Sequence, residues 1–471
     1  MMFNTYQYVL FLVLVLILYR LLPTVRQRNW LLLIAGSIFY GTWSYGYLLL
    51  LYLTIIVDYL VGKALWKYEN HRRTIFLASI FVNIGVLAVF KYSGRALSNA
   101  NHVLDLVGVH WSFPVWEFSL PLGISFYTFL SLSYTIDVFR RKTAPESSLL
   151  NYSVFVTFFP HLIAGPILRA NEFLPQVANP VETNIKPFFG INRIAIGLIK
   201  KVVIADWLAM LVEPVYDDPS SFSGLACLFA TYCYAFQIYL DFSGYIDIAI
   251  GSASLLGYEL PVNFNSPYLA GNITNFWRRW HISLSNWLRD YLYISLGGNR
   301  LGKMRTYINL MITMLLGGLW HGASWRFVIW GGIHGAFLAI HKLLKGEGMI
   351  EERVYVFSWK ALATFQLVCF SWIFFRATSM EKACTIIRSI VLIPKELSSA
   401  TVSPVYSVLI LLSSPIMLWL YANATRWRRR LETFSPNSNR ACLGYGVVTA
   451  VAVLVMAICS APQISFIYFQ F

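Results

Sequence analysis

The stretch that decides the fold is FWRRWHISLSNWLRDYLYISLGGNR, from Phe276 to Arg300, followed after an apolar run by LLGGLWHGASW, from Leu315 to Trp325. Each part contains a histidine that directly follows a tryptophan, and these histidines are His281 and His321. Because ionisable groups held at membrane depth are costly, they usually mark a pathway or a reaction centre. We therefore expect the surrounding apolar segments to form a scaffold that carries the two histidines.

The composition is that of a protein that crosses a membrane many times. Of the 471 residues, 57% are hydrophobic and 13% are charged, whereas a soluble domain is about 25% charged. The mean hydropathy is +0.59, and apolar runs near the roughly 20 residues that span a bilayer recur from end to end. The sequence therefore predicts an all-α, polytopic helical bundle of about ten to thirteen spanning or re-entrant helices.

The charge and the cysteines exclude several other classes of site. The formal net charge is +15, and we expect the lysines and arginines to gather in short cytoplasmic loops facing anionic lipids, rather than to bind nucleic acid. The six cysteines form no CxxC pair, so neither a disulfide framework nor a zinc site is predicted. No linker divides the chain, so we expect a single membrane domain over 1–471, with N-terminal helices at 1–118, a core at 119–345 and C-terminal helices at 346–471.

The basic residues also predict the orientation in the inner, cytoplasmic membrane. The loops that follow Tyr8–Leu22, Tyr47–Leu60 and Leu120–Phe139 each carry several lysines or arginines and are therefore expected inside. Lys91–Phe118 is mildly charged and is expected to be an external loop. The same alternation of inside and outside loops predicts that Trp359–Phe375 runs outward and that both termini lie outside.

Three segments are expected to be irregular. Val154–Leu168 is interrupted by prolines and by His161, which predicts a broken or re-entrant segment in which His161 could line a tunnel. Ile191–Met210 carries two adjacent lysines in its middle, so we expect it at an interface. Leu225–Leu256 is long enough for two segments.

The aromatic residues around His281 predict one helical face, because they recur at intervals of three, four, three and four. Arg278 and Arg279 lie largely off that face, and the helix is too polar to span, so we place it at the inner interface. A plain interfacial anchor explains the tryptophans and arginines but explains His281 less well. The residues of this face are Trp277, Trp280, Leu284, Trp287 and Tyr291.

His321 is expected deep in the membrane. A helix from Arg305 to His321 would cover roughly 24 Å of a bilayer core about 30 Å thick. The glycines at 317, 318 and 322 allow another backbone or a ligand to approach, and imidazole can exchange a proton near neutral pH, as a general base must. The alternative is a histidine hydrogen-bonded between helices. We favour a functional role for His321 and a structural one for His334.

Two further sets of polar residues stand out. Asp241 and Tyr245 form an i, i+4 pair in YLDFSGYIDIAIG, and the acid needs a partner such as an arginine or a backbone amide. Asp241 is either part of an ion or proton site or a structural residue that fixes the region of Arg278 in place. We favour the structural role. The closing FIYFQF (Phe466–Phe471) holds one hydroxyl nucleophile, Tyr468; the alternative is an aromatic anchor at the interface.

Together, these motifs resemble the membrane-bound O-acyltransferase family, in the branch of the alginate O-acetylation proteins. They follow the family's order over about the central two thirds of the chain, which makes the match far more specific than one short pattern. Besides the two parts quoted first, the matching stretches are PLGISFYTFLSLSYTIDVFRR (Pro121–Arg141), FFPHLIAGPILR (Phe158–Arg169), YLDFSGYIDIAIG (Tyr239–Gly251) and NFNSPY (Asn263–Tyr268).

The resemblance implies a helical fold around a cavity that crosses the bilayer. It implies that His321 matches the family's essential histidine and His281 its second polar site residue. It also implies acetyl-CoA as the acyl donor, with no bound cofactor and no metal. A separate periplasmic protein would complete transfer to an exported polysaccharide, and Tyr468 would be a candidate acyl acceptor.

A mechanism follows as a hypothesis. His321 takes the proton from an acceptor hydroxyl as the oxygen attacks the thioester carbonyl. His281, or a backbone amide near Gly317 and Gly318, stabilises the oxyanion. The residues expected to bind donor or substrate are Arg278 and Arg279, which suit phosphates, together with Trp280, Trp320, Asp241, Tyr245 and His161.

Three alternatives remain open from the sequence. The first is a D-alanyl transferase of the kind that modifies teichoic acid, or a transferase of another acyl group. The second is a transporter without chemistry, in which His281, His321 and Asp241 relay a proton or substrate. The third is a structural subunit that recruits a secreted partner. The final polymer also remains open among alginate, cellulose, peptidoglycan and other glycans.

Overall fold

The computed structural model describes residues 1–115, 118–181, 185–345, 358–398, 403–433 and 466. Over these ranges helices are the only regular secondary structure, which confirms the predicted all-α class. Five of the described helices are long and apolar enough to cross a membrane, and α1 and α5 are shorter apolar helices. The five spans are Tyr45–Lys67, Glu69–Leu106, Gly224–Leu255, Trp325–Leu344 and Ser407–Arg426.

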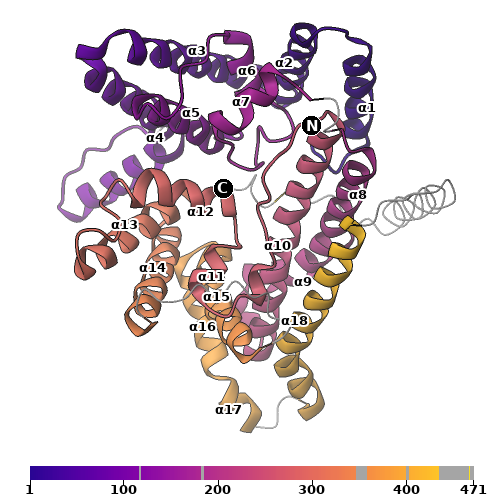
Figure 1. Cartoon of the computed structure of the whole chain (residues 1–471). Helices are drawn as coiled ribbons and strands as arrows, with labels where there is room; N and C mark the ends of the chain where they lie inside the picture. Colours follow the sequence, from indigo (N-terminus) through magenta and orange to yellow (C-terminus); the bar gives the residue numbers. More distant parts are fainter. Residues whose placement is uncertain (116–117, 182–184, 346–357, 399–402, 434–465, 467–471) are drawn as a thin grey trace, which may run out of the picture. The chain divides into compact units, whose positions relative to one another are not determined.

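The chain divides into two compact units, and α8 and α10 contribute to both. The first unit comprises Met1–Ile194 and Ile248–Pro261. Within it α3, α4 and α5 pack against one another (Figure 1), and every residue of α5 from Ile124 to Val138 is buried. The helices that build this unit are α1 (Tyr6–Leu21), α2 (Val25–Gly41), α3 (Tyr45–Lys67), α4 (Arg72–Leu106), α5 (Ile124–Phe139), α6 (Leu149–Thr157), α7 (Ala170–Ala178) and α8 (Pro187–Leu198).

The second unit comprises Ala195–Asp247 and Val262–Phe471. In it α14 packs against both α13 and α15 (Figure 1), and two π-helical segments, Ile199–Ala205 and Leu288–Tyr293, interrupt the α-helical pattern. The α-helices are α9 (Asp206–Asp217), α10 (Gly224–Leu255), α11 (Ile273–Trp277), α12 (Ile282–Trp287), α13 (Lys303–His321), α14 (Trp325–Lys345), α15 (Trp359–Arg376), α16 (Met380–Val391), α17 (Ile393–Ser398) and α18 (Pro404–Thr433).

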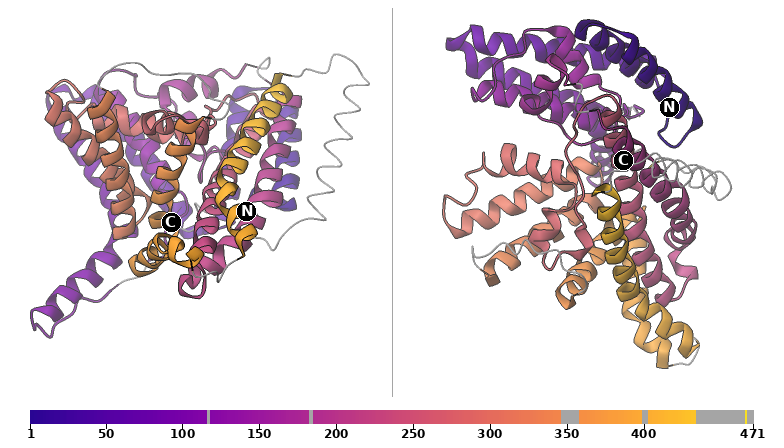
Figure 2. Two further views of the ribbon diagram at one scale, coloured as in Figure 1. Left: turned by 90° about the horizontal axis from the view of Figure 1, so that it is seen from below. Right: turned by 45° about the vertical axis from the view of Figure 1, so that its right-hand side comes forward.

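One predicted boundary is wrong, and one long stretch forms a single helix. The expected external loop Lys91–Phe118 is helical up to Leu106, and the last turns of α4 extend beyond the other helices of the first unit (Figure 2). No proline occurs in this loop before Pro114, and α4 ends where Gly108 adopts a φ of 76°, a common helix terminator. The stretch Leu225–Leu256, which is long enough for two segments, is the single helix α10, which has no proline.

One predicted irregularity is confirmed, and another has an unexpected cause. Helix α6 ends at Thr157 and the chain turns through 158–165, so Val154–Leu168 is broken as predicted. Ile191–Met210 is interrupted by a π-helical segment, but its lysines, Lys200 and Lys201, are buried. The lysines have acidic partners inside the second unit, so their charges do not require an interface, and the position of this segment relative to the membrane stays a prediction.

Candidate active site

His281 lies at a break between two helices. Instead of the predicted single helix, α11 ends at Trp277, the chain turns, and His281 adopts the left-handed conformation with φ 43° and ψ 57° just before α12. A continuous α-helix cannot contain that conformation. The aromatic residues predicted to share one face are still buried, so the periodicity identified the buried side chains but missed the break.

The segment NFNSPY holds the backbone on both sides of His281. The N–H of Ile282 donates to the carbonyl oxygen of Asn263 at 3.0 Å. The N–H and hydroxyl of Ser283 donate to Asn263 Oδ1 at 2.9 and 3.0 Å. On the other side, the N–H of Asn265 donates to the Arg279 carbonyl at 3.0 Å. Reasoning from the sequence missed Asn263 as a site residue, although the motif itself was noted.

The structure brings His281 and His321 into one aromatic cluster. His281 is fully buried and packs edge-on against Phe242, with ring centroids 4.8 Å apart. His321, the last residue of α13, packs against Trp330 and Phe375 with centroid distances of 5.2 and 5.1 Å. Trp320 contacts both histidines, at 6.3 Å from His281 and 4.8 Å from His321. The two predicted histidines are therefore neighbours of the same indole ring.

Glycines bring α13 and α14 close together beside His321. A Cβ atom added at Gly318 would lie 2.1 Å from the Phe327 carbonyl oxygen, and one added at Gly331 would lie 2.2 Å from the Met314 carbonyl oxygen. At Gly322 the added atom would meet the Phe327 ring at 2.3 Å. The predicted close approach at Gly318 and Gly322 is thus to a neighbouring helix, and it fixes the end of α13 that carries His321.

His334 is held by hydrogen bonds from both ring nitrogens. The Trp277 indole N–H donates to His334 Nδ1 at 3.3 Å, so Nε2 carries the proton and donates to the Ser371 hydroxyl at 2.8 Å. The ring is fully buried and bridges α11 and α15. This geometry suits the structural role that the sequence predicted.

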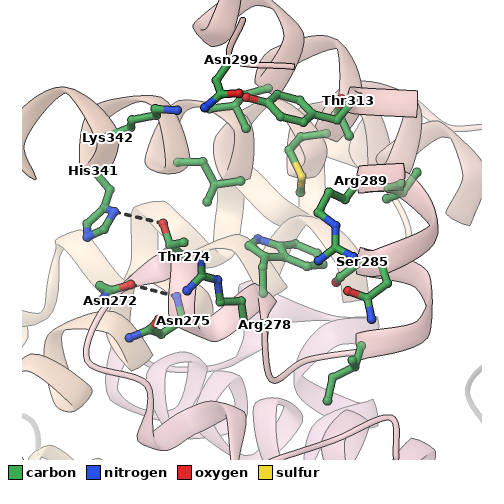
Figure 3. Close-up of a pocket in the computed structure, with 18 residues that line it drawn as sticks. Asn272, Thr274, Asn275, Arg278, Ser285, Arg289, Asn299, Thr313, His341 and Lys342 are labelled. Atoms are coloured by element: carbon green, nitrogen blue, oxygen red, sulfur yellow. Dashed lines mark hydrogen bonds between the residues drawn. The ribbon is translucent and has the colours of Figure 1, made fainter. Parts of the chain in front are cut away.

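A polar pocket of about 500 Å³ opens beside this cluster in the second unit (Figure 3). Its lining includes Arg278, Arg289 and Lys342, and no carboxylate is among its described lining residues. Arg289 also pairs with Asp290 at 2.6 Å. Apolar side chains of Trp277 and Met314 complete the wall. The arrangement suits a ligand that carries both anionic and apolar parts.

The pocket wall includes one of the two predicted arginines and neither histidine. Arg278 is exposed and lines the pocket, whereas Arg279 is buried and does not. Trp280 is also buried and packs between Phe276 and Trp372, with centroid distances of 5.7 and 5.1 Å. The pocket and His321 share α13, since Met314 lines the pocket seven residues before His321, roughly 10 Å along the helix axis.

Asp241 and Tyr245 belong to a different cluster. Asp241 accepts from Lys201 at 2.6 Å, and Lys201 also pairs with Asp206 at 2.8 Å. The acid therefore has the partner that it was expected to need, and that partner is a lysine of the π-helical segment. Tyr245 packs edge-on against Phe466, with centroids 5.1 Å apart.

The two remaining predicted residues are His161 and Tyr468. His161 lies in the first unit, buried, with Nε2 3.0 Å from the Phe155 carbonyl oxygen and its ring against Phe158 and Phe173. Tyr468 lies outside the described residues.

The fold and site define a multi-pass, all-α membrane protein with two buried histidines beside a cationic pocket. The model of MBOAT, the membrane-bound O-acyltransferase family, matches residues 4–380. The chain belongs to this family, which confirms the resemblance of its motifs and makes the protein an O-acyltransferase. A transporter without chemistry and a purely structural subunit are thereby set aside.

Relatives with three different activities share the family. The probable alginate O-acetylase AlgI of Azotobacter vinelandii is 43% identical over 378 residues, 79% of this chain and 74% of that protein. The peptidoglycan O-acetyltransferase of Helicobacter pylori is 37% identical over 399 residues, 77% and 73% of the two chains. The teichoic acid D-alanyltransferase of Streptococcus thermophilus is 32% identical over 234 residues, 47% and 56% of the two chains.

Proposed function

We propose that this O-acyltransferase takes an acetyl group from cytoplasmic acetyl-CoA and passes it across the inner membrane for O-acetylation of an exported polysaccharide or cell-envelope glycan. The observation that carries the proposal is that the cationic pocket is lined by α12, which follows His281, and by α13, which ends at His321. The named activities of the alginate and peptidoglycan relatives support an acetyl group and a glycan acceptor. Both chain termini lie outside in this arrangement.

The pocket binds the donor's phosphates. Arg278, Arg289 and Lys342 come from the end of α11, the π-helical segment Leu288–Tyr293 and α14. The three cationic side chains come from different elements and line the same pocket. Their guanidinium and ammonium groups pair well with phosphate oxygens. Arg279 supports this site through packing, because its side chain is buried away from the lining.

The transfer step uses His321 as the general base. It removes the proton of an acceptor hydroxyl as the oxygen attacks the thioester carbonyl, the carbon–sulfur bond then breaks, and coenzyme A leaves as the thiol after protonation. Gly317 and Gly318 lie inside α13, where amide groups bond to carbonyls four residues earlier. They are therefore poor oxyanion donors, and His281 takes that role.

The first acceptor is Tyr468 or a hydroxyl of the exported glycan. A hydroxyl on the closing segment would carry the acetyl group to the outer side, and a separate periplasmic acetyltransferase would then complete the transfer. Asp241, Tyr245 and Trp320 contribute by shaping the interior of the second unit around this route. His161, in the first unit, contributes to the binding of donor or substrate.

The test uses purified full-length protein in nanodiscs with acetyl-labelled acetyl-CoA. We expect the His321→Ala variant to lose donor consumption by about 100-fold or more, the range for removal of a general base. The matched control is His110→Ala, because His110 is an exposed histidine of the first unit. Wild type and control should behave alike. Equal rates in wild type and His321→Ala would exclude His321 as the base.

D-alanyl transfer is the second candidate, favoured by the similarity to the teichoic acid D-alanyltransferase over part of the chain. The same nanodiscs are offered acetyl-CoA or a D-alanyl thioester on a carrier protein. Turnover of acetyl-CoA that falls in an Arg278→Gln, Lys342→Gln double variant supports the proposed donor. Turnover of the D-alanyl thioester alone would replace it.

A further inference from the structure

One residue of the closing FIYFQF motif lies inside the second unit. Phe466 is 1% exposed. Its ring contacts Tyr245 of α10 edge-on at 5.1 Å, and the Lys201 ammonium lies 4.7 Å from its centroid. Phe466 therefore has defined contacts with α10 and with the π-helical segment Ile199–Ala205.

The lysine that meets this ring belongs to a buried ion-pair network. Lys201 binds Asp206 and Asp241 at 2.8 and 2.6 Å, and Lys200 binds Asp247 at 2.6 Å. The side chain of Lys201 is 1% exposed. Its ammonium is thus fixed on two sides by carboxylates.

An aromatic ring is a suitable further neighbour for such an ammonium. Its face attracts the cation without bringing another charge into the interior, where an extra charge would be costly. Tyr245 meets the same ring edge-on, an arrangement that aromatic pairs prefer. Lys201 and Tyr245 therefore form a seat that selects an aromatic residue over an aliphatic or charged one.

We propose that Phe466 is a positioning residue that seats the terminal motif in the second unit and so controls where Tyr468 presents its hydroxyl group. The inference rests on the proposed function, in which Tyr468 accepts the acetyl group. Two residues of extended chain span at most about 7 Å, so a fixed Phe466 restricts the reach of Tyr468. Asp241 and Asp206 act through Lys201, which they hold in place.

The location of the ring is tested first, by a measurement that needs no acetyl transfer. A photoreactive benzoylphenylalanine replaces Phe466 in the full-length protein in nanodiscs, and cross-linked peptides are mapped by mass spectrometry. We expect cross-links to peptides that contain Lys201 or Tyr245. The same analogue at Phe370, an exposed residue of α15, should cross-link elsewhere. Cross-links from position 466 that avoid both peptides would overturn the proposal.

The positioning effect is tested by single-turnover acetylation of Tyr468. We expect Phe466→Ala to lower the rate constant by at least tenfold while coenzyme A binding changes less than twofold. Phe466→Tyr, which keeps the ring, should stay within threefold of wild type, whereas Phe466→Leu should resemble the alanine variant. Rate constants rather than yields are compared, because a merely unstable variant would lose yield but keep its rate.

The outcomes separate the two proposals. If wild type labels Tyr468 and Phe466→Ala labels it equally fast, the positioning role fails while the acceptor role stands. If wild type consumes acetyl-CoA but never labels Tyr468, the acceptor role fails and the positioning role fails with it. Lys201→Met is not a suitable test, since it would leave two buried carboxylates without their cation.

Discussion

At the scale of single residues, the unusual feature is the backbone of His281. Histidine tolerates the left-handed region better than branched residues do, but the conformation persists only where the surroundings enforce it. Here the enforcement comes from Asn263, which accepts hydrogen bonds from the two residues that follow His281. Ser266, in the same NFNSPY motif, also has a positive φ of 49°.

Asn263→Ala tests this enforcement. The change removes an acceptor from the Ser283 N–H and hydroxyl, and each such loss costs about 1–3 kcal/mol when the donor is left unsatisfied. We expect a lower thermal midpoint and a turnover rate reduced about tenfold, with little change in half-saturation by acetyl-CoA. Asn423→Ala is the control, because its amide bonds only within α18. An unchanged turnover rate would show that His281 does not depend on Asn263.

At the scale of elements, the contact of α13 with α14 positions His321. Backbone atoms of one helix lie where a side chain of the other would begin, at Gly318 and at Gly331. Small residues at such crossings let helices in a membrane gain close packing, because the hydrophobic effect gives them little there. A one-atom change at the crossing should therefore displace the end of α13 that carries His321.

Two adjacent glycines of α14 provide a matched pair for this prediction. In Gly331→Ala the new Cβ would lie 2.2 Å from the Met314 carbonyl oxygen, so the helices must separate. In Gly332→Ala the nearest atom is Leu315 Cδ2, at an ordinary 3.5 Å. We expect Gly331→Ala to lower both the thermal midpoint and the turnover rate. Gly332→Ala should equal or slightly exceed wild-type stability, because alanine favours helix by up to about 1 kcal/mol over glycine. Equal behaviour of the two variants would contradict the packing argument.

The elements also show what the sequence could and could not predict. Periodicity identified the buried aromatic residues around His281, because burial follows local spacing. The break at His281 was missed, because the bonds that impose it come from Asn263, eighteen residues upstream by sequence number. Reasoning from the sequence did not predict the burial of Lys200 and Lys201 for the same reason. Their acidic partners include Asp241 and Asp247, which are distant in the chain and bring the charges inside.

At the scale of the whole molecule, the alternation of basic loops predicts the orientation. The all-α class and the multi-pass character followed from composition alone, since both depend on sums over the chain. The pocket did not, because its cations come from three elements whose meeting depends on tertiary packing. The orientation in the membrane, like the composition, depends on a sum over the whole chain. It can nevertheless be tested by labelling one residue.

Cys384 reports the orientation. It lies on α16, which follows α15, a helix that is predicted to run outward. It is exposed together with Glu381 and Arg388, while Ala383 and Ile386 are buried. We expect a membrane-impermeant maleimide to label it in intact spheroplasts, with the signal absent in Cys384→Ser. That variant also measures any labelling of the other cysteines. A signal from Cys384 that appears only after permeabilisation would reverse the predicted topology.

The π-helical segment Ile199–Ala205 has a consequence for the history of the family. A π turn closes over one more residue than an α turn, so loss of a single residue would restore α geometry without breaking the helix. A shorter homologue whose missing residue is one of the two lysines would offer one lysine where this chain offers Lys200 and Lys201. It could no longer neutralise both Asp241 and Asp247. Insertion of a residue here and gain of an acid on α10 are therefore expected to have been inherited together.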